Sequence, residues 1–97
     1  MNKIFTLNNK EYEVDTKIDF GAICEMEEYG VDLMALANSK QTFSQMRNIT
    51  AYFTKLDLDE ATEEINQHIL NGGSINDLIV LFNIIAESDF FQKMGKK

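Results

Sequence analysis

The first stretch of the chain alternates apolar and polar residues with the period of a β-strand. Residues 4–7 form one β-prone run, and Tyr12 and Val14 alternate with glutamates in the next. Asn8-Asn9 lies between the two runs, and asparagine tolerates the positive φ of a tight hairpin turn. The pattern therefore predicts a β-hairpin over residues 3–14, with Tyr12 and Val14 on one face.

From residue 19 onward the apolar residues recur with helical spacing, which predicts a helical bundle over residues 19–94. Gly30 and Gly72-Gly73 predict where two of the helices end. Side chains suited to capping helix N-termini precede four of the helices: Asp19, Thr42, Asp57 or Asp59, and Ser74. The expected helices cover residues 20–29, 32–38, 43–56, a stretch between Asp57 or Asp59 and Asn71, and 75–93.

The apolar faces of these helices indicate which side chains form the core. In the first helix this face includes Phe20, Ile23 and Cys24. In the helix 43–56 the face comprises Phe43, Met46, Ile49, Phe53 and Leu56, and in the next helix it comprises Ala61, Ile65, His68 and Ile69. The short link at residues 71–74 predicts that this helix and the last one form an antiparallel αα-hairpin.

The expected helix 75–93 is apolar nearly all round. Ile75, Leu78, Ile79, Phe82, Ile85 and Ala86 fill one face, and Val80, Leu81, Ile84 and Phe91 fill much of the rest. A helix of this kind is buried nearly all round. Either it runs through the middle of the bundle or part of it is an interface with another chain, and the sequence leaves both alternatives open.

Length and composition favour one small helical domain. The chain has 97 residues, of which 44 % are hydrophobic and 26 % are charged, and it contains no proline. These values are ordinary for a globular domain, and the lack of proline favours helix. We therefore expect a single domain over residues 1–97 that is mostly α, a small bundle of four to five helices with an N-terminal β-hairpin.

The charge and the cysteine content limit the partners and the compartment. Sixteen acidic against nine basic residues give a net charge of −7, and the basic residues are scattered. Without a basic patch, such a chain repels phosphate backbones, so we expect no binding to nucleic acid.

One cysteine cannot form an intramolecular disulfide, which indicates a reducing compartment. No segment resembles a signal peptide or a membrane span, so we expect a soluble intracellular protein.

Few residues are suited to catalysis. The chain has one histidine, His68, and one cysteine, Cys24. His68 lies between Ile65 and Ile69 and is better explained as a core-edge ring bonded to a carbonyl than as a base. Cys24 is better explained as a small buried side chain than as a reactive thiol. One imidazole and one thiol cannot supply a metal cluster. We therefore expect no enzymatic activity, no bound metal and no cofactor.

Apolar residues outside the main stripes are the candidates for contact with another chain. Phe90, Phe91 and Met94 lie beyond the main apolar stripe and are hard to bury in a monomer of this size. Leu33 and Met34 belong to the expected short helix, and methionine suits surfaces that repack around a partner. These five residues form the predicted partner-binding set.

The order of these parts resembles a known family. The segments that carry the resemblance are Asn9–Tyr12 of the hairpin, Asp19–Ala22 with Glu25–Glu28, Asp59–Ile65, Asn71–Gly73 and Ser88–Phe91. In this order they resemble the small tail assembly chaperones of long-tailed phages and prophages of Gram-positive bacteria. The resemblance covers most of the chain.

The resemblance implies a helical protein that binds the tape measure protein and keeps it soluble until tail tube subunits polymerise around it. It also implies self-association, a possible contact with the tail tube protein, a place in the cytoplasm of the bacterial host, and absence from the mature virion. The family often makes a longer product by ribosomal frameshifting. Gly95-Lys96-Lys97 fits either slippery purine codons or a basic helix terminus. The family fixes no functional residues that map onto this sequence.

The net charge supports an alternative from another class, an acidic phage-encoded inhibitor that mimics DNA and blocks a nucleic-acid-binding protein. Such mimicry needs carboxylates spaced like phosphates on one continuous face. Here the carboxylates are spread over the hairpin and two of the expected helices. Salt-sensitive binding to basic proteins would favour the inhibitor, and salt-insensitive apolar association would favour the chaperone.

Overall fold

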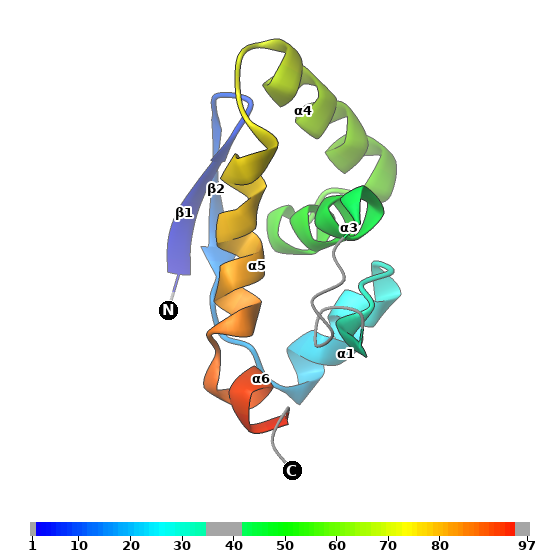
Figure 1. Ribbon diagram of the computed structural model, residues 1–97, viewed down its shortest axis with the longest axis vertical. Helices are drawn as coiled ribbons and strands as arrows, with labels where there is room; N and C mark the ends of the chain where they lie inside the picture. Colours follow the sequence, from blue (N-terminus) through cyan, green and yellow to red (C-terminus); the bar gives the residue numbers. More distant parts are fainter. Residues whose placement is uncertain (1, 35–41, 95–97) are drawn as a thin grey trace.

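The computed structural model describes residues 2–34 and 42–94. Two antiparallel strands begin the chain, and helices make up most of the rest (Figure 1). The elements are β1 (Asn2–Leu7), β2 (Lys10–Asp15), α1 (Phe20–Glu28), α3 (Phe43–Thr54), α4 (Leu58–Leu70), the 3₁₀ helix η1 (Ile75–Leu78), α5 (Ile79–Ala86) and α6 (Asp89–Met94). The protein is therefore mostly α with an N-terminal β-hairpin, as the sequence predicts. The expected helix 32–38 lies largely outside the described residues.

The hairpin turn has the conformation that its two asparagines predict. Asn8 and Asn9 have φ angles of 52° and 63°. Leu7 pairs with Lys10, which leaves the asparagines as a two-residue turn. Side chains alternate across the two strands, and the inner face contributes three buried residues to the core: Phe5, Leu7 and Val14.

Hydrogen bonds at the helix N-termini match the predicted caps. The side chains of Asp19 and Thr42 each accept the backbone N–H three residues later, at 2.9 and 3.2 Å. Asp57 caps α4 in a reciprocal capping box with Glu60. Such caps each stabilise a helix by about 1 kcal/mol, so the starts of these helices are fixed locally.

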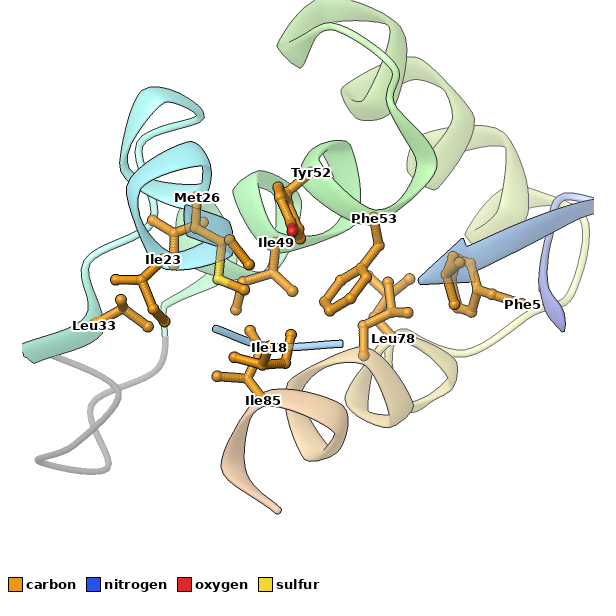
Figure 2. Close-up of a cluster of buried hydrophobic side chains, with 14 of the residues drawn as sticks. Phe5, Ile18, Ile23, Met26, Leu33, Ile49, Tyr52, Phe53, Leu78 and Ile85 are labelled. Atoms are coloured by element: carbon orange, nitrogen blue, oxygen red, sulfur yellow. The ribbon is translucent and has the colours of Figure 1, made fainter. Parts of the chain in front are cut away.

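One cluster of buried side chains joins the hairpin to the helices (Figure 2). The side chains labelled in Figure 2 are Phe5, Ile18, Ile23, Met26, Leu33, Ile49, Tyr52, Phe53, Leu78 and Ile85. The core-facing residues of α5, Leu81 and Ile85, have no exposed surface. Only one face of α5 is buried, because Ile79, Val80, Phe82 and Ile84 stay partly exposed, so the segment is not buried all round and neither alternative for it is excluded.

The expected continuous helix 75–93 is wrong, because the segment is divided into η1, α5 and α6. Ser88 stabilises the second break: its Oγ donates to the carbonyl of Ile85 at 2.7 Å and accepts the N–H of Phe91 at 3.2 Å. After this break α6 lies near the start of α1 (Figure 1). There the rings of Phe90 and Phe20 have their centroids 6.5 Å apart.

The expected antiparallel αα-hairpin between α4 and the last helices is also wrong. α4 and α5 both pack on α3 and make few contacts with each other. The two helices are joined near the upper end of the molecule in Figure 1 and diverge from there. As a result, two residues expected in the core are open to solvent, with Phe43 77 % exposed and Ile69 44 % exposed.

Candidate functional site

The predicted partner-binding residues lie in different environments. Leu33 is buried in the core, whereas the neighbouring Met34 is 73 % exposed. Phe90 and Phe91 are half-buried and pack against the core, because the break before α6 turns them inward. The side chain of Met94 lies outside the described part of the structure. The described members of the set therefore do not form one exposed apolar surface.

A groove between α3, α4 and η1 gathers apolar side chains instead. Its volume is about 500 Å³. The lining residues are Phe43, Ser44 and Arg47 of α3, Thr62, Ile65 and Ile69 of α4, and Ile75 and Leu78 of η1. Phe43 and Arg47 are four residues apart, as are Ile65 and Ile69, so each pair lies on one face of its helix. The two helix faces form the walls of the groove.

The groove is apolar and open to solvent. Phe43 is largely exposed and Ile69 is exposed over nearly half of its surface, whereas Leu78 is only 3 % exposed. Covering such side chains with a partner is favourable by roughly 25 cal/mol per Å² of apolar surface removed from water. Exposed apolar surface gathered in a groove is typical of an interaction site. The groove is therefore the candidate functional site.

No family model, no curated protein and no solved structure matches this chain. The resemblance to tail assembly chaperones therefore stays a hypothesis. None of the helices in the described ranges is long and apolar enough to cross a membrane. Within those same ranges, no three His, Cys, Asp or Glu side chains are grouped so that they could hold a metal ion.

His68 joins three elements at the edge of the molecule. Its Nδ1 accepts the backbone N–H of Asn8 at 2.9 Å, and its Nε2 lies 2.8 Å from Oδ2 of Asp77. The prediction that a carbonyl binds this ring is therefore wrong. A neutral ring whose Nδ1 accepts a hydrogen bond has its hydrogen on Nε2, and this Nε2–H donates a hydrogen bond to the carboxylate of Asp77. This hydrogen bond lowers the pKa of Asp77. Both ring nitrogens thus connect the hairpin turn, α4 and η1.

Cys24 is exposed on α1, so the prediction of a buried cysteine is wrong. The buried residues of α1 are Ala22, Ile23 and Met26, whereas Phe20 is 67 % exposed. The buried face is therefore rotated relative to the expected one. The rotation brings Met26, which has no exposed surface, into the core and leaves Cys24 outside it.

The sequence did not predict the groove: its apolar side chains, Phe43 and Ile69 among them, were all expected in the core, and none of the predicted partner-binding residues lines it. The covering of a helix face depends on which helices pack against it, and the local pattern does not specify this. One signal was present at Phe43, which directly follows the Thr42 cap. A side chain in the first turn of a helix lies at the end of the packed region and is easily left uncovered.

Proposed function

We propose that this protein is a non-enzymatic tail assembly chaperone of a long-tailed phage or prophage. It would bind the tape measure protein in the cytoplasm of the bacterial host and keep it soluble while tail tube subunits assemble around it. In this proposal the chain self-associates, needs no cofactor and is left out of the mature virion.

The open apolar groove between α3, α4 and η1 is the observation that carries the proposal. A chaperone for a helical client needs an apolar surface that receives the client, because an amphipathic helix buries its apolar face in such a groove. It also needs a polar exterior that keeps the complex in solution. The net charge of −7 meets the second need.

Co-expression with the tape measure protein tests the proposal. We expect the wild-type chain to raise the soluble fraction of the tape measure protein, and the double variant Phe43→Gln/Ile69→Gln to lose most of this effect. Both side chains are exposed, so the variant should keep its fold. Glutamine makes the groove polar without changing its charge. The soluble fraction is measured by centrifugation and gel densitometry, and folding by circular dichroism.

Ile4→Gln is the matched control, because Ile4 is 56 % exposed on the hairpin and does not line the groove. We expect this variant to act like the wild type. A folded double variant that still keeps the tape measure protein soluble would exclude the groove as the client site. A wild-type chain that has no effect on solubility would overturn the proposed function itself.

The acidic inhibitor has less support from the structure. Several carboxylates hold the protein's own elements together: Asp57 caps α4, Glu64 pairs with Lys10 at 2.9 Å, and Asp77 binds His68. These paired carboxylates therefore do not form a continuous row of unpaired charges spaced like phosphates. Binding to a nucleic-acid-binding enzyme that high salt abolishes and the groove variant leaves unchanged would favour the inhibitor instead.

A further inference from the structure

The outer edge of β1 carries backbone groups that the hairpin itself leaves unpaired. We propose that this edge pairs with the same edge of a second copy of the chain, so that the two hairpins form one four-stranded antiparallel sheet with a two-fold axis at Ile4. The contact lies on a different surface from the groove. It gives a place to the self-association in the proposed function, on which the inference rests only for the expectation that the chain self-associates.

The register of the hairpin decides which backbone groups face outward. Leu7 and Lys10 flank a two-residue turn and therefore form a hydrogen-bonded pair. Hydrogen-bonded and non-hydrogen-bonded pairs alternate along an antiparallel ladder. The backbone N–H and C=O groups of Asn2, Ile4 and Thr6 thus point away from β2. Within the described ranges, no other residue forms a hydrogen bond with these groups.

This edge is open to solvent. β1 is the outer strand of the hairpin in Figure 1, whereas α3 packs against β2 and α4 meets the hairpin near its tip. The side chains of Asn2, Ile4 and Thr6 are exposed, and that of Ile4 is 56 % exposed. An exposed edge strand that carries apolar side chains is a template for pairing with another strand.

The exposed face of β1 is complementary to itself around Ile4. When two β1 strands pair antiparallel about this residue, Ile4 lies opposite Ile4 of the second copy, and Asn2 lies opposite Thr6. An apolar side chain therefore meets an apolar one, and polar side chains meet polar ones. Each opposed pair also exchanges two backbone N–H···O bonds. A register centred on Lys3 or Phe5 would form two such pairs instead of three, so the Ile4 register is favoured.

Charge selects β1 over β2 as the edge that the two copies share. The outward positions of β2 hold Glu11, Glu13 and Asp15. Like charges directly opposite each other destabilise a strand pair. β1 contains no acidic residue. Pairing through β1 therefore brings no carboxylate of one paired strand opposite a carboxylate of the other, which pairing through β2 would do.

The oligomeric state of the full chain at increasing concentration is the first test. Analytical ultracentrifugation should show the mass rising from 11.1 kDa towards twice that value. Each copy carries a net charge of −7, so added salt should strengthen the association by screening the repulsion between the copies. This measurement uses no client and is therefore independent of the tape measure protein.

Two proline variants assign the contact to one edge of the hairpin. Ile4→Pro removes an outward N–H from each copy and should raise the dissociation constant of the dimer by at least about tenfold. Proline is tolerated on an edge strand where the missing N–H faces solvent, so the fold should persist. Glu13→Pro is the matched control, because Glu13 lies opposite Ile4 and its N–H faces outward from β2. It should not weaken the dimer. Circular dichroism measures the folding of both variants.

Cysteine cross-linking tests the register without any change to the backbone. The exposed Cys24 is first replaced by serine. Ile4→Cys should then form a disulfide between copies, because the Cα atoms of a hydrogen-bonded pair lie about 5.5 Å apart, within the range that a disulfide spans. Glu13→Cys should not, because three strand spacings, about 14 Å, separate it from Glu13 of the second copy. Non-reducing gel electrophoresis after mild oxidation measures both.

A chain that stays monomeric at every concentration would overturn the inference. A dimer that both prolines weaken equally, or that cross-links through Glu13→Cys and not through Ile4→Cys, would overturn it too. The proposed function fails separately. A chain that dimerises through β1 but does not keep the tape measure protein soluble would support the inference and overturn the function. A monomeric chain that keeps the tape measure protein soluble would overturn the inference and leave client binding standing.

Discussion

Two glycines show what a single residue contributes at the end of a helix. Gly30 follows α1 with φ of 86°, and Gly72 follows α4 with φ of 96°. The sequence predicts both as helix stops, because glycine adopts positive φ without steric cost. Their surroundings differ. A Cβ at Gly30 would lie 2.9 Å from Nδ2 of Asn48, whereas a Cβ at Gly72 would meet no atom within 4 Å.

We expect Gly30→Ala to lower the free energy of unfolding more than Gly72→Ala does. Both changes force alanine to adopt positive φ, which costs about 1 kcal/mol. Gly30→Ala also displaces the buried amide of Asn48, which donates to the carbonyl of Gly30 at 3.0 Å. The lost hydrogen bond adds about 1–2 kcal/mol. Urea denaturation measures both variants, and equal losses would show that Asn48 moves aside at no cost.

At the scale of elements, the beginnings of the helices were predictable and their relative positions were not. A cap such as Asp19 or Thr42 acts on an N–H three residues away, so the local sequence determines it. The break at Ser88 interrupts a continuous apolar pattern and is reinforced by the contact of Phe90 with Phe20, far away in sequence. The groove depends in the same way on the divergence of α4 from α5, which no local pattern records.

We expect Ser88→Ala to weaken the contact between α6 and α1. The variant lacks the hydroxyl that binds the carbonyl of Ile85 and the N–H of Phe91, a loss of about 1 kcal/mol for a cap of this kind. Alanine also favours continuation of α5 into a longer helix. NMR contacts between the rings of Phe20 and Phe90 should weaken, while circular dichroism keeps its helical signal.

Ser44→Ala is the control for this change, since Ser44 is exposed on α3. It should change the free energy of unfolding by less than about 0.5 kcal/mol. If the ring contact in Ser88→Ala keeps its wild-type strength, packing of the phenylalanines alone maintains the break. In that case the hydroxyl of Ser88 is dispensable for the position of α6.

At the scale of the whole molecule, polar contacts tie the tip of the hairpin to the helices that form the groove. Asn8 meets His68 through its backbone N–H and meets Glu64 and Asn71 through its side chain. His68 in turn binds Asp77 of η1. His68 precedes Ile69 of the groove wall on α4, so these contacts help to hold that wall in place.

Acid should release these contacts. A hydrogen bond from Lys10 lowers the pKa of Glu64, and one from His68 lowers the pKa of Asp77. A carboxyl group whose pKa is lowered by folding stabilises the protein at pH values above its ordinary pKa, which is 4.5 for Glu64 and 3.8 for Asp77. The stabilisation is lost as the pH falls below these values towards the lowered pKa of the folded state.

The melting temperature should therefore fall more steeply below pH 4.5 in the wild type than in Glu64→Gln. The variant should be less stable than the wild type at pH 7, because it lacks the ion pair with Lys10, and the two curves should approach each other in acid. Glu63→Gln removes a carboxylate of the same helix that makes no ion pair with a described residue. It should keep the acid dependence of the wild type. The same slope in both variants would mean that Glu64 and its contacts with Lys10 and Asn8 do not carry the acid response.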